Sequence, residues 1–388
     1  MMADFRFLTA GESHGACLTA IVEGLPAGLK INRDGIDRDL ARRQQGYGRG
    51  GRMKIEKDRV TVLSGIRFGE TIGSPITLQI QNKDGKNWAE KMAPFGESAG
   101  ERVTAPRPGH ADYAGIQKYD RQDIRDILER SSARETAARV AAGALAKQFL
   151  AACGVEIVSQ VVNIGGITAT PRQREKMLRG DAASALNCFD PVAEEQMKER
   201  IKEAAKDGDT LGGVFEVAVR GVPVGIGSHI QWDRRLDARL AAAFMSIQAV
   251  KGVEIGDGFR LADLPGSMAH DELYMDDRNR VYRRTNHAGG IEGGMSNGEE
   301  IVLRAVMKPI PTLMKPLASV DIATHSPVSA VKERSDVCAV TAASVVGEAM
   351  AALIITQAVL EKFGGDAMGD VLTALQAYKR RLARENLQ

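Results

Sequence analysis

The chain of 388 residues has few aromatic side chains, few cysteines and almost no net charge. Phe, Trp and Tyr make up only 5% of the residues, so a core has to be built from Ala, Val, Ile, Leu and Met. A net charge of +2 excludes a uniformly basic nucleic-acid coat and an acidic solvating tail. Hydrophobic residues at 44% and charged residues at 26% are usual for a globular protein and exclude an intrinsically disordered one.

The four cysteines offer neither a disulfide framework nor a zinc site. None forms a Cys-x-x-Cys pair, and no histidine stands at zinc-ligand spacing from them, so we expect no metal. This usage favours a reducing compartment, and since the N-terminus shows no signal peptide, we expect a cytoplasmic protein. The apolar segment 337–360 is long enough to span a membrane, but Glu348 at its centre and its Ala and Gly content predict a buried core helix.

Hydrophobic periodicity predicts an α+β fold. Alternating apolar residues indicate strands at 5–9, 18–23, 60–66, 76–81, 155–164, 214–220 and 301–307. Apolar residues at helical spacing and helix-end signals indicate helices at 34–45, 133–152, 191–207, 233–251 and 336–363. Because these strands and helices do not alternate regularly, the pattern favours α+β over a doubly wound parallel sheet.

Five pairs of short matches occur in the same order in the two halves of the chain. They are GESHG at 11–15 with GDTLG at 208–212, VEGLPAG at 22–28 with VRGVPVG at 219–225, IDRDLA at 36–41 with LDARLA at 236–241, GETIGSPITL at 69–78 with GMSNGEEIVL at 294–303, and ERS at 129–131 with ERS at 333–335. We predict one domain over 1–388, with halves of about 1–155 and 207–363, a connector at 156–206 and a C-terminal tail at 364–388. Shared turn chemistry is the alternative explanation of the matches.

The two halves differ at polar positions. His14 is matched by Leu211, and Ser132 is matched by Asp336. A duplicated scaffold that has diverged in this way suggests one asymmetric site made from both halves.

Residues 40–55 combine five cationic side chains with four glycines and contain no carboxylate. Such a segment favours an anionic ligand, which can be a phosphate, a carboxylate or a nucleic-acid backbone. Its GxGxxG spacing does not indicate a dinucleotide site, because a predicted helix precedes it where that motif requires a strand. Two alternatives stay open, an RNA contact by the Gly/Arg loop 42–54 and a solvated basic loop.

The segment RSSARET at 130–136 predicts an anion-binding helix start. Ser132 and Glu135 form a capping box, and free N–H groups at 133–135 would favour an anion together with nearby arginines. ERSD at 333–336 repeats the pattern with Asp336 in the cap position. An ordinary capped helix with solvated arginines is the alternative.

Two of the six histidines stand beside candidate anion-binding segments. His14 lies in GESHG and His110 in RPGH, so both are better candidates for chemistry than an isolated histidine. Two further loops suit the approach of backbone to a flat or phosphorylated ligand, the glycine-rich 285–298 and the proline-fixed KPIPT at 308–312.

Taken in chain order, these segments resemble the chorismate synthase family. The resemblance rests on GESHG, RRQQGYGRGGRM, RPGHADY, ERSSARET, RRTNHAGGIEGGMSNG, KPIPT and ERSD, which span nearly the whole chain. It implies an α+β fold, a β-α-β sandwich with a pseudo-two-fold duplication and long central Ala-rich helices, assembled as a homotetramer. It further implies conversion of 5-enolpyruvylshikimate 3-phosphate to chorismate and phosphate, the last step of the shikimate pathway.

The same resemblance implies a reduced FMN cofactor. Since the chain shows no flavin-reductase module, a monofunctional enzyme is implied, supplied by an external flavin reductase with NADPH as the indirect reductant. A small-molecule substrate and neither a nucleic-acid nor a membrane partner are expected. The rival classes are a generic flavoprotein oxidoreductase and an RNA-binding protein.

The resemblance also assigns roles to residues. His14 would protonate the departing phosphate, His110 would manage the charge of the reduced flavin, and Asp336 would help to move a proton at the flavin. The implied substrate-binding residues are Arg43, Arg49, Arg107, Arg134 and Arg334. The implied flavin-binding residues are Arg130, Ser131, Ser132, Gln248, Ala249, Gly293, Lys308, Pro309, Ile310, Pro311, Thr312 and Arg334. Position 248 is Gln where the family often has Asn, and His287 receives no role.

Overall fold

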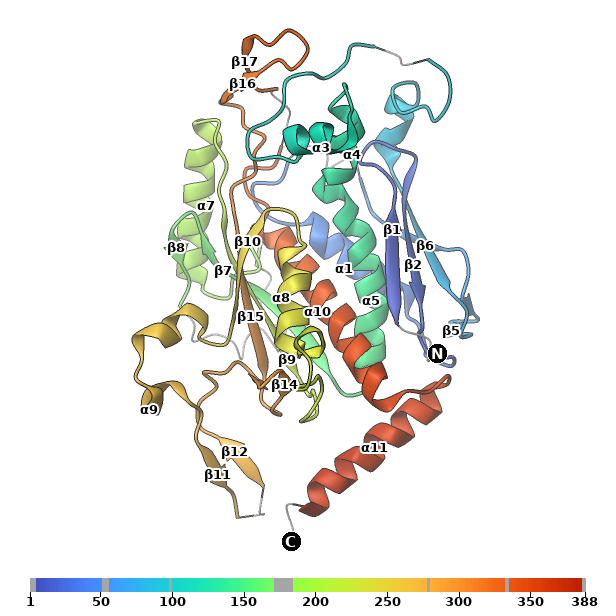
Figure 1. Ribbon diagram of the computed structural model, residues 1–388, viewed down its shortest axis with the longest axis vertical. Helices are drawn as coiled ribbons and strands as arrows, with labels where there is room; N and C mark the ends of the chain where they lie inside the picture. The colour runs from blue at the N-terminus through green and yellow to red at the C-terminus, as the bar shows by residue number, and fades with distance from the viewer. Residues whose placement is uncertain are drawn as a thin grey trace.

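The computed structural model describes residues 5–50, 56–97, 100–170, 184–277, 280–331 and 335–385. Two antiparallel sheets enclose a layer of helices, of which α5 (Thr136–Ala152) and α10 (Val340–Phe363) are central (Figure 1). Helix α5 packs on the first sheet, α10 packs on the second, and the two helices contact each other extensively. The mixed helix and sheet content confirms the predicted α+β class.

The first sheet has the strand order β1-β2-β6-β3. Its strands are β1 (Arg6–Ala10), β2 (Cys17–Glu23), β6 (Ile76–Gln81) and β3 (Val60–Val62). Alternate residues of β2 and β6 are buried against the helices, as the period-two pattern predicts. The predicted strand 60–66 is interrupted, because Gly65 adopts a φ of 80° before β4 (Ile66–Arg67) begins.

The second sheet has the strand order β10-β15-β9-β7-β8. Its strands are β10 (Val250–Ile255), β15 (Ile301–Met307), β9 (Gly213–Arg220), β7 (Glu156–Ile164) and β8 (Ile167–Thr168). Strand β7 pairs with β9, so residues 156–164 of the predicted connector belong to this sheet. The sheet is antiparallel throughout, like the first one.

The two sheets arrange corresponding elements in the same order. In each half a strand pair is followed by a helix, α1 (Arg33–Gln44) or α8 (Leu236–Met245), then by two further strands and a long central helix. The order β1-β2-β6-β3 of the first sheet therefore matches the order β7-β9-β15-β10 of the second. Four of the five sequence matches fall at corresponding places in these two element orders, and the fifth, ERS at 333–335, lies partly outside the described residues.

Helix ends follow local sequence in most cases. Asn32 caps α1, and Asp190 caps α7 (Pro191–Lys206), which Gly208 follows with a φ of 69°. The predicted helix 233–251 is too long, because residues from Val250 onward form β10. The predicted helix 336–363 begins only at Val340, with Ala339 as a cap that makes no side-chain hydrogen bond.

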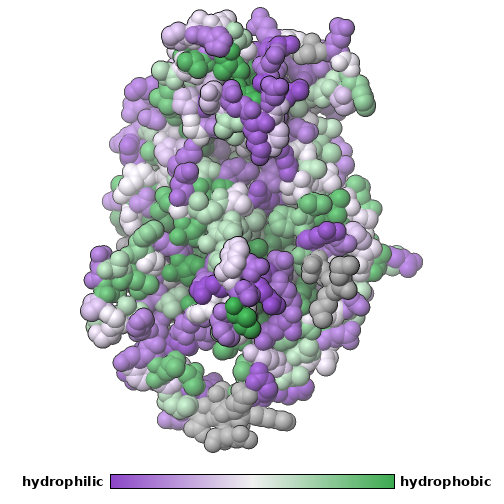
Figure 2. Space-filling view, viewed as in Figure 1, coloured by the Kyte–Doolittle hydropathy of each residue, from purple (hydrophilic) through white to green (hydrophobic). Residues whose placement is uncertain are grey.

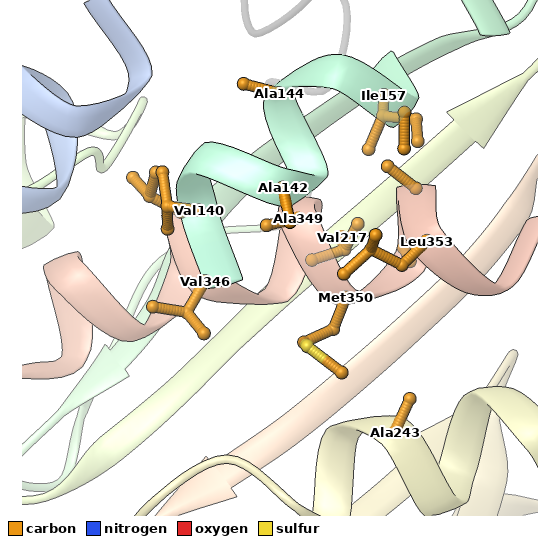
Figure 3. Close-up of a cluster of buried hydrophobic side chains, with 14 of the residues drawn as sticks. Val140, Ala142, Ala144, Ile157, Val217, Ala243, Val346, Ala349, Met350 and Leu353 are labelled. Carbon is orange, nitrogen blue, oxygen red and sulfur yellow. The ribbon is translucent and has the colours of Figure 1, made fainter. Parts of the chain in front are cut away.

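Small residues let α5 and α10 approach each other closely (Figure 3). A Cβ placed on Gly143 of α5 would lie 2.4 Å from the Cβ of Ala349 in α10. A Cβ on Gly347 would lie 2.6 Å from the ring of Phe215 in β9. The Ala and Gly content of both helices thus sets the thickness of the helical layer.

Within the described residues, α10 is the single helix long and apolar enough to cross a membrane, and 83% of its most apolar window is buried in the protein. Glu348 in its middle is also buried, where it bonds to Arg42, Lys147 and Ser159. This burial confirms the prediction of a core helix.

Two short helices, α3 (Asp112–Tyr119) and α4 (Arg125–Ser131), form a small hydrophobic core of their own through Ile116, Ile124 and Ile127. The remaining elements are β5 (Glu70–Thr71), η1 (Lys83–Trp88), η2 (Ala133–Glu135), η4 (Trp232–Arg234), η5 (Gly258–Asp263), α9 (Gly266–Ala269), β11 (Leu273–Met275), β12 (Val281–Arg283), β13 (Ile291–Glu292), β14 (Met295–Ser296), β16 (Ala318–Val320), β17 (Pro327–Ser329) and α11 (Met368–Glu385).

Candidate active site

A cavity of about 460 Å³ lies at the N-terminal ends of α5 and α10. Both halves of the chain line it, the first through the β1–β2 loop and the second through the segment after β15. Its volume suits a small-molecule site. The space-filling view shows a face on which hydrophilic and hydrophobic residues are mixed (Figure 2).

Most of the predicted site residues meet on the wall of this cavity. They are His14, Arg43, Arg49, Arg107, His110, Ser131, Ser132, Arg134, Gln248, Ala249, Lys308, Ile310, Pro311, Thr312 and Asp336.

Arg43 and Arg134 converge on one buried carboxylate, Asp58. Arg134 Nη1 donates to the two oxygens of Asp58 at 2.7 and 2.6 Å, while Arg43 Nη1 lies 3.6 Å from Asp58 Oδ2. Arg43 also donates from Nε to the Thr136 hydroxyl and from Nη2 to the Ala133 carbonyl. These contacts fix both guanidinium groups at the start of α5.

Two nitrogens of this cluster, Arg43 Nη1 and Arg134 Nη2, are buried without a hydrogen-bond acceptor among the described residues. Burial lowers the pKa of Arg43 to about 9, because Asp58 offsets only part of the desolvation and repulsion from Arg134 and Arg49 adds to it. Both Arg43 and Arg134 are 4% exposed. Guanidinium groups that repel one another and keep unsatisfied N–H donors favour an anion beside them.

Asp336 holds the loop that follows α1. Its Oδ2 lies 2.9 Å from Arg49 Nη1, and its Oδ1 accepts the backbone N–H of Gly50 at 2.6 Å. Since α10 begins at Val340, Asp336 does not cap that helix, and the prediction of a cap at this position is wrong. The acidic residue instead fixes an arginine on the cavity wall.

His14 is held by a buried carboxylate of α4. Its Nδ1 lies 3.0 Å from both carboxylate oxygens of Glu129, and its backbone N–H donates to Oε2 at 2.8 Å. Burial raises the pKa of Glu129. The hydrogen bond and the charge of His14, together with the charge of Arg125, outweigh burial and hold this pKa below its usual value. The His14 ring also packs on Trp88, with 4.2 Å between ring centroids.

His110 has a similar arrangement at the start of α3. Its Nδ1 lies 2.5 Å from Asp112 Oδ1, and Arg107 donates to the same carboxylate from Nε at 2.8 Å and from Nη2 at 3.1 Å. Burial raises the pKa of Asp112, but the hydrogen bonds from His110 and Arg107 outweigh burial and hold this pKa well below its usual range. Arg107 Nη1 further contacts the Thr312 hydroxyl at 3.3 Å, which joins this cluster to the segment after β15.

Another part of the wall is apolar and contains one unsatisfied acceptor. Its apolar members are Leu128, Ile247, Met307, Ile310, Ala339, Ala342, Ala343 and Val346. Gln248 donates from Nε2 to Glu135 at 3.1 Å, which orients its amide, and its Oε1 is buried with no donor among the described residues. Ala249 adopts a φ of 67°, which is rare for alanine, and its carbonyl accepts the Lys308 N–H at 2.9 Å.

Four predicted site residues do not belong to this wall as described. Arg130 is half exposed and donates to the Thr9 carbonyl, Pro309 lines a neighbouring cavity of about 450 Å³, and Gly293 lies in the turn between β13 and β14. Arg334 lies outside the described residues.

At the start of the first long helix, the backbone N–H groups of Arg134 and Glu135 bond to a residue of the same segment. Ser132 Oγ accepts the Arg134 N–H at 3.3 Å, and the Ser132 carbonyl accepts the Glu135 N–H at 3.2 Å, so the prediction of free N–H groups is wrong for these two residues. Glu135 does not complete a capping box, because its carboxylate accepts from Arg139 and Gln248 instead.

Sequence reasoning missed the carboxylates that hold the site together, Asp58, Asp112 and Glu129. The two-residue spacing of His110 and Asp112 in RPGHADY was an available signal. No spacing connects Asp58 to its arginines or Glu129 to His14, because those contacts form only through the fold; only Arg125 stands at helical spacing from Glu129.

Comparisons with known proteins identify the family. Residues 5–360 match the sequence model of the chorismate synthase family. The chain is 60% identical over 384 residues to a chorismate synthase of Geobacter sulfurreducens, covering 96% of this chain and 98% of that protein. It is 57% identical over 387 residues to a chorismate synthase of Syntrophotalea carbinolica, covering 99% and 100% of the two chains.

A solved structure agrees with these sequence matches. It is a crystal structure of a chorismate synthase, with a TM-score of 0.80 and 43% identity, covering 99% of this chain and 100% of that one. The matches support neither a generic oxidoreductase nor an RNA-binding protein. The chain belongs to the chorismate synthase family, the lyases of the last step of the shikimate pathway.

Proposed function

We propose that the central cavity binds 5-enolpyruvylshikimate 3-phosphate and catalyses its 1,4-elimination to chorismate and phosphate. The observation that carries this assignment is the cluster of buried guanidinium groups with two unsatisfied N–H donors. The substrate carries two carboxylates and a phosphate, which match such donors in charge and geometry. In the reaction a C–H bond and the C–O bond to phosphate break and a C=C bond forms, so no net oxidation occurs.

The arginines bind and orient this substrate through its three anionic groups. Arg43, Arg49, Arg107 and Arg134 stand on the wall at fixed positions, since each forms an ion pair with a carboxylate of the protein. Arg334 is the remaining member of the proposed set. Fixed guanidinium groups reduce the cost of orienting the reacting bonds.

His14 donates a proton to the departing phosphate, and Glu129 holds its ring in place for this step. His110 balances charge next to the cofactor, and Asp336 helps to move a proton while it fixes Arg49.

The wall also fits reduced FMN. Its apolar part can cover a flat ring system, and the buried Oε1 of Gln248 needs an N–H donor, which an isoalloxazine ring can provide. The residues that would hold the cofactor on this wall are Ser131, Ser132, Gln248, Ala249, Lys308, Ile310, Pro311 and Thr312, joined in the proposal by Arg130, Gly293, Pro309 and Arg334. When bound, reduced FMN supplies the electron density that starts the loss of phosphate, and it takes up a proton or hydrogen atom from the ring of the substrate.

Several wider properties belong to the same proposal. The matching strand orders of the two sheets support an internal duplication about a pseudo-two-fold axis. We also propose a cytoplasmic homotetramer that receives reduced FMN from an external flavin reductase, with NADPH as the indirect electron source.

The test is anaerobic phosphate release from 5-enolpyruvylshikimate 3-phosphate. We expect release that requires catalytic amounts of reduced FMN and that stops in air or with oxidised FMN. Absence of phosphate release from folded protein with reduced FMN bound would refute the proposed function.

A further inference from the structure

The helices α3 and α4 each carry one buried carboxylate that meets a histidine of the cavity. Asp112 opens α3 and Glu129 lies in the last turn of α4, with side chains 1% and 2% exposed. The two helices share their own small core, built on Ile116, Ile124 and Ile127. Both carboxylates therefore belong to one packed unit, which we call the α3–α4 platform.

Glu129 is bound more completely than a simple ion pair requires. Its carboxylate accepts hydrogen bonds from Nδ1 and from the backbone N–H of His14, and Arg125 donates to its Oε1 at 3.0 Å. The carbonyl of Glu129 also accepts the backbone N–H of Ser13 at 3.0 Å. These bonds fix the position, the tilt and the protonated nitrogen of the His14 ring at once.

We propose that Glu129 and Asp112 are positioning residues, which hold His14 and His110 with a ring proton on Nδ1 and turn Nε2 of each ring away from the platform. In the proposed reaction the proton that His14 gives to the phosphate is a second one, carried on Nε2 while Nδ1–H stays bonded to Glu129. A carboxylate accepts but cannot donate, so an imidazole nitrogen 3.0 or 2.5 Å from it has to carry the proton. Arg107 Nη2, which only donates, also lies 3.1 Å from His110 Nδ1, but it bonds to the same Asp112 oxygen, and the shorter contact of Nδ1 with Asp112 decides the tautomer. Neutral histidine in water prefers the proton on Nε2, so the platform selects the less common tautomer. A wrong tautomer is costly for a proton-transferring histidine.

The neighbouring arginines keep these carboxylates in the acceptor form. Arg125 bonds to Glu129 and Arg107 bonds to Asp112. Both carboxyl groups have pKa values below their usual range in spite of burial, because hydrogen bonds and positive charge favour the ionised form. Each platform residue thus acts through its histidine and not on the substrate.

The chain offers a matched control away from the cavity wall. His287 Nδ1 lies 2.8 Å from Asp257 Oδ2, the same type of pair, on the loop that precedes β13. Replacing Asp257 changes the same kind of contact without touching the proposed site.

The first experiment reads the tautomers directly by ¹⁵N NMR of histidine-labelled protein without cofactor or substrate. We expect Nδ1 to be protonated in both His14 and His110. The Nδ1–H population of His14 should fall in Glu129→Leu, and Glu129→Gln should retain part of it, because glutamine keeps one acceptor. Asp112→Asn should change the His110 signals, and Asp257→Asn only those of His287. A wild-type His14 protonated on Nε2 alone, or unchanged in Glu129→Leu, overturns the proposal.

The second experiment measures the rate and rests on the proposed function. Glu129→Leu should lose about a hundredfold in turnover, the scale of general acid catalysis, and Glu129→Gln should lose less. In a His14→Ala background, Glu129→Leu should add no further loss, because it acts through that ring. Asp257→Asn should keep the wild-type rate.

The two experiments separate two kinds of failure. A further loss in the His14→Ala background, or a normal rate in Glu129→Leu, overturns the positioning role. Failure of wild-type protein to release phosphate overturns the proposed function, while the tautomers still decide whether the platform positions the rings.

Discussion

At the scale of single residues, the contacts of Asp336 indicate which role its carboxylate has. It accepts the Gly50 N–H and pairs with Arg49, and it stands four residues before the first residue of α10. Asp336→Asn keeps an acceptor for Gly50 but removes the charge opposite Arg49 and the titratable oxygen. We expect a turnover lower by about a hundredfold and only a small fall in melting temperature, because no helix cap is lost and asparagine still accepts the Gly50 N–H.

Anaerobic single-turnover absorbance of the flavin, recorded beside a thermal melt, checks this expectation. Asp190→Asn is the matched control, because Asp190 caps α7 without lining the cavity and asparagine caps equally well. A normal rate in Asp336→Asn would show that Asp336 has no part in the reaction.

At the scale of elements, sequence predicted the strands better than the helix starts. Strand β2 has the clear alternation of a sheet with one buried face, so its bounds were evident. Helix α10 is buried on nearly all sides, so it lacks an amphipathic stripe that would mark its first turn. The ERSD segment supplied a false start signal, because its Asp336 has a partner, Arg49, that only the fold brings near.

The contact of α5 with α10 leads to a prediction about packing. Gly143→Ala would place a methyl group 2.4 Å from the Cβ of Ala349, and both helices would have to move apart. We expect the free energy of unfolding to fall by about 1–3 kcal/mol, the usual cost of overpacking a core. Urea unfolding followed by circular dichroism measures this loss.

Gly369→Ala in α11 is the control for the change of backbone freedom, since its Cβ would meet no atom within 4 Å. It should leave stability unchanged or raise it slightly, because alanine is the better helix former. Equal effects of the two substitutions would contradict the close contact of the central helices.

At the scale of the whole molecule, Glu348 joins the two halves of the fold. Arg42 of α1 donates to both of its carboxylate oxygens at 2.7 Å, Lys147 of α5 donates at 2.8 Å, and Ser159 of β7 donates at 2.7 Å. Burial raises the pKa of Glu348, but the charges of Lys147 and Arg42 outweigh burial and lower this pKa to about 2. The residue that argues against a membrane span is therefore the one that connects both sheets through the helical layer.

This arrangement determines in which direction the free energy of unfolding changes with pH. Because the folded pKa of about 2 lies below the ordinary value of 4.5, the stability from Glu348 is complete above pH 4.5 and is lost as the pH falls through about 2. Glu348→Gln should lower the free energy of unfolding at neutral pH by about 3 kcal/mol, the lower end for breaking a buried ion pair, because Arg42 and Lys147 keep some contact with solvent.

The difference between wild type and Glu348→Gln should shrink as the pH falls from 4.5 towards 2, where the wild-type carboxylate takes up its proton. Urea unfolding over this pH range measures the difference. Glu361→Gln is the control on the same helix, because Glu361 forms a similar two-bond pair with Arg239 but is 43% exposed, so it should cost less than about 1 kcal/mol. Equal losses at neutral pH, or a difference that persists at pH 2, would mean that the buried network does not hold the two halves together.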